Sequence, residues 1–273
     1  MMAWTFIVGL TGLSAGLSLI MSVAWLVWRH SGNSGWVDTI WTFGLGFVGL
    51  CSAVMASLMG SPTSRAWLVA LMAVIWSLRL GLHIALRTRG VADDPRYAKL
   101  VREWGADASR RMFWLLQKQA LVSIPLAVSM WLAASNPLPP PVMQAVGALV
   151  IFITAVAGEA VADEQLRRFR QDQSNSVKVC DTGFWRWSRH PNYFFEWLGW
   201  LAYPALAIEF SGNYLWGFLT FAAPLCMYWL LVYVSGVPPL EEHMLARRGD
   251  AFRKYQMRTN VFFPGPSKVP NGG

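Results

Sequence analysis

Charged side chains are scarce in this sequence. Aspartate, glutamate, lysine and arginine make up 14% of its 273 residues, whereas 55% are hydrophobic and the mean hydropathy is +0.36. A typical soluble domain is about 25% charged, so the composition excludes an ordinary soluble protein and indicates a membrane protein. Cysteine is also rare: Cys51, Cys180 and Cys226 lack the spacing of a disulfide framework or a zinc site. We therefore expect no metal centre.

The common catalytic signatures are missing as well. The chain has no serine nucleophile elbow, no HExxH, no Walker loop and no GxGxxG that follows a strand. These absences argue against soluble nucleotide-binding folds and the common hydrolases. Any chemistry must therefore come from polar residues placed among apolar ones.

Long apolar runs dominate what is present, and each is long enough to cross a membrane as a helix. We predict an all-α integral membrane bundle of seven transmembrane helices, with residues 1–273 forming a single domain. The predicted spans cover about 3–28, 36–59, 66–86, 113–133, 142–161, 191–208 and 214–235.

The distribution of basic residues predicts the orientation. The net charge is +8, and the loops after spans one, three, five and seven carry most of the arginines, whereas the other loops carry only Arg65. By the positive-inside rule, the N-terminus lies outside and the C-terminus in the cytoplasm. The net positive charge is then explained by cytoplasmic loops that lie beside anionic membrane lipids, rather than by binding of nucleic acid.

One stretch, Gly183–Glu196 (GFWRWSRHPNYFFE), combines basic and polar residues with the start of an apolar run. Pro191 suits the first turn of a helix, and Asn192 and Glu196 then share one face. Free backbone N–H groups and basic side chains together make an anion site. The basic residues are Arg186, Arg189 and His190. The alternative is an interfacial anchor, which has no use for Asn192 or for Glu196 inside an apolar helix.

A second group of ionisable residues lies inside the third predicted span. Arg79 and His83 are four apart and therefore on one helical face. Burial of either without a partner costs several kcal/mol, so such a pair is by default a functional-site hypothesis. The alternative is that both bond neighbouring helices and only stabilise the bundle.

Arginines suit phosphates, and Asn192 with Glu196 suits an amide or an ammonium group. A dinucleotide or nucleoside cofactor would satisfy this set. The protein would hold the reactive atom of the cofactor against a lipophilic substrate that enters from the bilayer.

Three segments carry a resemblance to a known family: GFWRWSRHPNYFFEW, DEQLRRFR (163–170) and YQMRTNVFFP (255–264). They closely resemble the steroid 5-alpha-reductase family, in particular its bacterial branch. The resemblance implies a seven-helix, NADPH-dependent reductase of the bacterial inner membrane, with its cofactor site facing the cytoplasm. It implies saturation of the C4–C5 double bond of a 3-oxo-4-ene steroid or a similar enone. The C-terminal half, about 142–268, carries most of the cofactor motif.

The resemblance also implies roles for individual residues. Asn192 and Glu196 would hold the nicotinamide amide, with Glu196 at the catalytic centre. Arg79 matches the arginine of the third helix in the family, and His83 stands where relatives often have tyrosine. The other expected cofactor-binding residues are Asp163, Arg167 and Arg170 for the adenosine and phosphates, Arg87 and Arg89 of the basic loop after the third helix, Arg189, His190, Tyr193, and Arg253 and Tyr255 of the tail.

The substrate-binding pattern departs from the family. Relatives that reduce steroids bind the ketone with a glutamate of the second helix and a tyrosine of the third. Here Trp76, three residues before Arg79, occupies about the place of that tyrosine, and Asp38 is the only acid of the second span. We expect Asp38 to polarise the ketone, with capping of the second helix as its alternative role.

Other classes of protein remain open at this point. Isoprenylcysteine and phospholipid methyltransferases, which use S-adenosylmethionine, also carry an RHPxY segment and a pair of glutamates after the last helix, here Arg189–Tyr193 with Glu241 and Glu242. A transporter or scaffold would bind no cofactor. The basic tail is expected to form a helical lid broken at Gly249, or else an amphipathic helix on the inner leaflet.

Overall fold

The computed structural model describes residues 2–61, 63–90 and 93–268. The described residues form helices and loops without a strand, and the one extended pairing among them is a bridge between Ser188 and Asn260. The chain divides into two compact units. The first comprises Met1–Ala145 and Tyr203–Ala223, and the second Val146–Ala202 and Pro224–Gly273.

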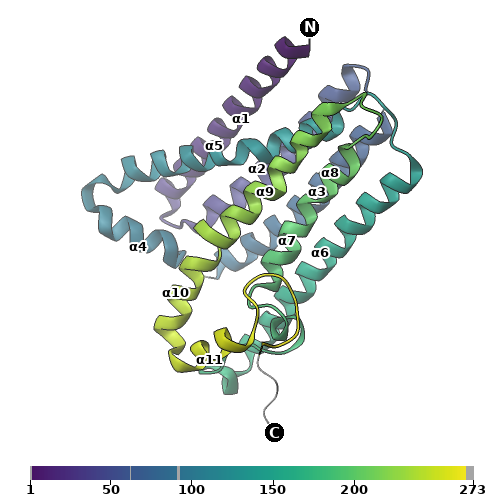
Figure 1. Ribbon diagram of the computed structural model, residues 1–273. Helices are drawn as coiled ribbons and strands as arrows, with labels where there is room; N and C mark the ends of the chain where they lie inside the picture. The colour runs from purple at the N-terminus through teal and green to yellow at the C-terminus, as the bar shows by residue number, and fades with distance from the viewer. Residues whose placement is uncertain (1, 62, 91–92, 269–273) are drawn as a thin grey trace. The chain divides into compact units, whose positions relative to one another are not determined.

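The first unit is built on long helices from the N-terminal half (Figure 1). Their bounds are α1 Met2–Ser31, α2 Gly35–Leu58, α3 Thr63–Arg89, α4 Pro95–Trp104 and α5 Ala108–Ala134, followed later in the chain by α8 Ala202–Ala207 and the 3-10 helix Leu215–Phe221. A short 3-10 turn, Gly105–Asp107, joins α4 to α5.

Small residues allow α2 and α3 to approach closely. A Cβ atom on Gly46 would overlap the side chain of Ser77, and one on Gly49 would lie 2.5 Å from the Cβ of Ala73. In a membrane, helices associate through such close packing because lipid provides no hydrophobic driving force between them. The two glycines therefore fix the pairing that carries Asp38 and Arg79.

Side chains from other parts of the first unit cap the end of α8. Gln144 donates to the carbonyls of Ala205 and Ile208 at 3.0 and 2.6 Å, Asn136 donates to Ala207 at 2.9 Å, and Arg65 donates to Leu206. Helix-terminal carbonyls lack intrahelical partners, and in an apolar setting each must be satisfied by protein.

Arg65, expected in a loop, instead lies in the first turn of α3 and is completely buried. Its Nε donates to the Leu138 carbonyl at 3.0 Å, so its charge is used inside the unit. The one arginine in the predicted loops that are otherwise poor in basic residues therefore has partners inside this unit.

The second unit contains most of α6 and the C-terminal helices (Figure 1). The helices are α6 Val142–Gln171, α7 Pro191–Trp200, α9 Ala222–Trp229, α10 Val237–Arg248 and α11 Asp250–Arg258, with a π-helical turn at Leu230–Val234. Gly249 separates α10 from α11 with a positive φ of 49°, which confirms the predicted helix break.

Six described helical segments are long and apolar enough to cross a membrane: Phe6–Ser31, Gly35–Leu58, Ser64–Arg89, Tyr97–Ala134, Val142–Gln171 and Leu215–Arg248. The chain is therefore a multi-pass membrane protein. Seven spans were predicted, and the difference arises at 191–208, where α7 and α8 are only 10 and 6 residues long. Pro204 has no N–H to continue the helical ladder there. The orientation of the termini stays a prediction.

Candidate functional site

The segment that precedes α7 is fixed to the last turns of α6. Gln165 accepts a hydrogen bond from the backbone N–H of Phe184 at 3.0 Å, and Trp185 donates its indole N–H to the Ala162 carbonyl at 2.9 Å. Gly183 has a φ of 60°, and a Cβ there would lie 2.5 Å from the Gln165 amide. Glycine is therefore required at position 183, where the stretch Gly183–Glu196 begins.

Two motifs far apart in the sequence meet in this unit. Asn192 in the first turn of α7 donates from Nδ2 to Oδ1 of Asp163 on α6 at 3.3 Å. Pro191 occupies the first position of α7, as predicted. The DEQLRRFR and RHPNY segments thus contribute to one polar cluster, which the sequence could pair only through the family resemblance.

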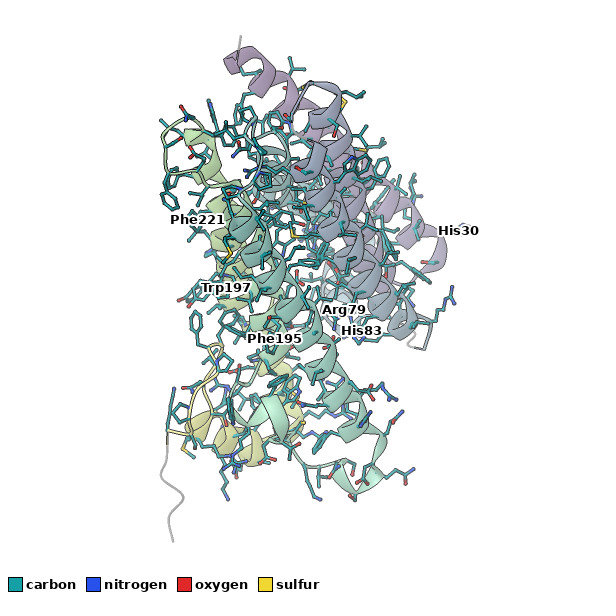
Figure 2. The ribbon with its side chains drawn as sticks, turned by 90° about the vertical axis from the view of Figure 1, so that its right-hand side faces the viewer. His30, Arg79, His83, Phe195, Trp197 and Phe221 are labelled. Atoms are coloured by element: carbon teal, nitrogen blue, oxygen red, sulfur yellow. The ribbon has the colours of Figure 1, made fainter. Side chains whose placement is uncertain are left out.

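Glu196 lies one turn further along α7 and is buried, with 7% of its surface exposed. It accepts a hydrogen bond from the indole N–H of Trp200 at 2.9 Å. The helix lies so close to α6 that a Cβ on Gly158 would overlap the ring of Phe195. On the same helix, the indole N–H of Trp197 (labelled in Figure 2) donates to the Pro224 carbonyl at 3.1 Å. Asn192 and Glu196 are therefore held by a well-packed helix.

A buried ionic cluster lies just before α7. Arg189 forms a two-pronged pair with Glu241 of α10, with distances of 2.7 and 3.3 Å from Nε and Nη2. His190 Nε2 lies 2.9 Å from the same carboxylate, and Gln256 of α11 donates to it at 2.6 Å. Arg189 also donates to the Thr259 carbonyl at 2.7 Å. This cluster joins the RHPNY segment to the tail.

The contacts of His190 define its protonation state. Burial lowers the pKa of His190 below its usual value, and the hydrogen bond to Glu241 offsets this only in part. A neutral imidazole must then carry its proton on Nε2 in order to donate to the carboxylate. Its other nitrogen, Nδ1, is buried and has no partner among the described residues. An unoccupied hydrogen-bond acceptor therefore lies beside Arg189 and Asn192 in the chain.

We predict a pH dependence of stability from this histidine. Because its pKa is lowered in the folded state, the unfolded chain binds the proton first as the pH falls below about 6.5. Stability is therefore present above that pH and is lost below it, by at most about 1.4 kcal/mol per pH unit. Melting temperatures measured from pH 8 down to pH 5 should fall in the wild type and less steeply in His190→Gln. Equal slopes in the two proteins would assign the effect to other groups.

The C-terminal tail packs on the stretch Gly183–Glu196. Tyr255 of α11 is buried and donates its one O–H to the Trp185 carbonyl, with the Ser188 carbonyl also within reach at 3.3 Å. Burial raises the pKa of its phenol, which keeps it a donor. The N–H of Arg189 donates to the Asn260 carbonyl at 2.8 Å. Arg253, by contrast, is exposed and lies 3.6 Å from Asp250. The apolar side of α11 thus faces protein, and Tyr255 holds the segment that carries His190.

The arginines at the end of α6 are exposed. Glu164 accepts from Arg167 at 2.6 and 2.7 Å and from Arg168 at 2.6 Å. Arg170 is exposed one turn beyond Arg167. The three arginines of this end, Arg167, Arg168 and Arg170, outnumber its two acids, Asp163 and Glu164, and arginine suits phosphate. Contact with a cofactor stays a prediction for Arg167 and Arg170.

In the first unit, Asp38 belongs to a polar chain that involves a tyrosine. The hydroxyl of Tyr97 on α4 donates to Asp38 at 3.3 Å and accepts from Gln119 of α5 at 2.8 Å. Asp93 accepts from the Ser34 N–H at 2.8 Å just before α2, and Asp38 is the acid in the first turn of that helix. The alternative role of Asp38 at the start of α2 therefore stays open.

The remaining predicted residues of this unit lie along α3. Trp76 is buried, edge-on to Trp41 with ring centroids 6.2 Å apart. Arg79 is half-buried and His83 exposed, one turn apart on α3 (Figure 2). Exposed basic side chains follow: Arg87 lies 4.0 Å from Asp94, and Arg89 ends the helix. These residues, with Asp38, belong to the first unit, whereas all predicted residues from Asp163 onward belong to the second.

Two residues of interest were missed or misread from the sequence. Tyr97 lies in a polar connector with no periodic pattern, so no signal pointed to its contact with Asp38. Glu241 was interpreted as a methyltransferase signature and as part of the charged tail, but not as the partner of Arg189 and His190, both of which it bonds. Contacts across 50 or more residues have no local signature.

The long apolar helices and buried polar clusters define a multi-pass helical membrane protein with a polar site in each unit. Residues 24–259 match the family described as "Protein of unknown function (DUF1295)", and the chain belongs to that family. Searches of curated proteins and of solved structures found no match.

Proposed function

We propose that the protein is an NADPH-dependent reductase that saturates the C4–C5 double bond of a 3-oxo-4-ene steroid or a similar lipophilic enone. The observation that carries this proposal is the hydrogen bond between Asn192 and Asp163. It unites, within one unit, the two segments whose resemblance to the steroid 5-alpha-reductases implies binding of opposite ends of NADPH. When bound, this cofactor supplies a hydride.

The donors and acceptors of the second unit fit such a cofactor. A carboxamide offers two N–H donors and one oxygen acceptor, which suit the Glu196 carboxylate and the Asn192 amide. Arg167 and Arg170 would bind phosphates, and the anchoring of many phosphate contacts would orient the nicotinamide.

We propose that Asp38 acts on the ketone through Tyr97. The single O–H of Tyr97 donates to Asp38 and would turn to the ketone oxygen when substrate binds, while Gln119 continues to donate to the Tyr97 oxygen. A donor at the carbonyl oxygen stabilises the negative charge that develops when hydride reaches the β carbon of the enone. A proton then adds to the α carbon. The substrate is lipophilic and enters from the bilayer.

The topology belongs to the same proposal. We propose that α7 and α8 together make a seventh crossing, with the N-terminus outside and the C-terminus in the cytoplasm. The basic residues of the loops support this orientation. The cofactor site then faces the cytoplasm of a bacterial cell, where NADPH is present.

One observation favours a second candidate, an S-adenosylmethionine-dependent membrane methyltransferase. The two signatures of that class meet in this unit, because Glu241 pairs with Arg189 at 2.7 Å and with His190 at 2.9 Å. The same contacts also serve the reductase by fixing the start of α7. The two classes differ in cofactor, which makes cofactor binding the deciding test.

Thermal stability of the detergent-purified protein should rise with NADPH. A ligand that binds only the folded state at 100 times its Kd stabilises by about 2.7 kcal/mol. Melting temperatures should therefore increase with NADPH, less with NADH, and stay unchanged with S-adenosylmethionine. Stabilisation by S-adenosylmethionine alone would assign the protein to the methyltransferases. No stabilisation by any of the three would favour a transporter or scaffold.

A further inference from the structure

We propose that the corner where α4 turns into α5 binds the headgroup of one anionic phospholipid. This site lies in the first unit and is independent of the reductase activity. Figure 1 shows α4 and α5 meeting at this corner. A cavity of about 390 Å³ opens there, and it is lined by Trp104, Asp107, Arg110, Arg111, Trp114, Leu115 and Lys118.

The side chains that line the cavity carry a net positive charge, which favours binding of an anion. Arg110 and Arg111 lie in the first turn of α5, where the helix dipole is already positive. Asp107 is the one acid among the described residues of the lining, and it lies 3.9 Å from Arg111. Three cationic groups therefore face one carboxylate. A phosphodiester would neutralise the excess and accept several charge-assisted hydrogen bonds.

Lys118 provides a second, separate observation. It stands seven residues beyond Arg111, about 10 Å further along the axis of α5, and both lie in the segment Tyr97–Ala134, which is long and apolar enough to span a membrane. An ammonium group there extends toward the polar headgroup level, with its methylene stem along apolar surface. Lys118 lines the same cavity as Arg110 and Arg111. A headgroup held by Lys118 would therefore lie in the cavity.

Aromatic and apolar side chains identify the source of the phosphate as lipid. Trp114 is 58% exposed and Leu121, two turns further along α5, is 65% exposed. Tryptophan is enriched at membrane interfaces, where its ring contacts acyl chains and headgroups together. Acyl chains would lie along this exposed surface of α5 with the headgroup in the cavity. A free phosphate would gain nothing from these apolar contacts.

Native mass spectrometry of the full-length protein tests the proposal with phosphatidylglycerol and phosphatidylcholine of the same acyl composition. Phosphatidylglycerol should bind at least tenfold more tightly, since each cation near an anionic headgroup contributes about 1 kcal/mol. The double variant Arg110→Gln/Lys118→Gln removes two of these cations and should lose about 30-fold in that affinity. All replaced side chains are exposed, so the variant should keep the wild-type melting temperature without lipid.

The matched control is Arg247→Gln/Lys254→Gln, which removes two exposed charges from α10 and α11. It should leave the affinity for phosphatidylglycerol unchanged. Equal loss in both double variants would overturn the proposal in favour of general attraction to charge. Equal binding of the two lipids would overturn it too, as would displacement of the lipid by millimolar inorganic phosphate or NADPH.

Discussion

Replacing Glu241 by alanine should lower the free energy of unfolding by about 3 to 5 kcal/mol, the cost of breaking a buried ion pair. The side chains of Arg189 and Glu241 are 7% and 12% exposed, and the carboxylate also accepts from His190 and Gln256. Its loss leaves a guanidinium buried without a counter-charge. The melting temperature should fall on the order of 10 °C, measured on detergent-purified protein.

Glu242 is the matched control, because it follows Glu241 on α10 and its side chain is exposed. Glu242→Ala should change stability by less than about 1 kcal/mol, as for most exposed charges. Glu241→Gln should be intermediate, since its amide keeps the shape of the carboxylate but not its charge. Equal melting temperatures for Glu241→Ala and Glu242→Ala would show that the cluster does not hold the tail on α7.

The features of the fold that follow from local patterns were predicted well. Apolar runs located α1, α2, α3, α5 and α6 because a spanning helix needs only length and hydropathy. Gly249 and Pro191 were placed correctly at a helix break and at a helix start. Each of these features depends on neighbouring residues, which a sequence displays directly.

The features that depend on distant contacts were not predicted. Arg65 was expected in a loop because its partners, the carbonyls of Leu138 and Leu206, lie 73 and 141 residues away. The division of the sixth apolar run into α7 and α8 was also missed, because hydropathy alone does not register the missing N–H of Pro204.

The candidate site shows the same limit. Asn192 and Glu196 were singled out correctly as unusual in an apolar helix, and the helix and its shared face followed from their spacing. Their partners, Asp163 from α6 and Trp200 from the next turn, emerged only from the structure. For Tyr97 the sequence offered neither periodicity nor an apolar context, so its contact with Asp38 required the packing of α4 beside α5.

Asn192→Ala and Glu196→Gln should each reduce NADPH-dependent turnover about 100-fold, because displacing a reacting group by about 1 Å costs that much. Turnover is followed by the loss of NADPH absorbance with a lipophilic enone as substrate. Binding of NADPH, measured by thermal stabilisation, should be largely retained, because phosphate contacts from other residues supply most of the affinity. A fall in turnover with retained binding is the signature of a misplaced nicotinamide.

The melting temperature of Glu196→Gln and two matched variants distinguish a loss of function from misfolding. Glutamine at position 196 keeps an oxygen that accepts from the Trp200 indole, so Glu196→Gln should melt close to the wild type. Asn213→Ala and Glu209→Gln make the same chemical changes in a loop of the first unit, where Asn213 is exposed and Glu209 half-buried, and both should keep full turnover. Full activity in Asn192→Ala and Glu196→Gln would remove the nicotinamide from α7. Because the Asn192 contact with Asp163 is what unites the two cofactor segments, that result would also reject the reductase proposal.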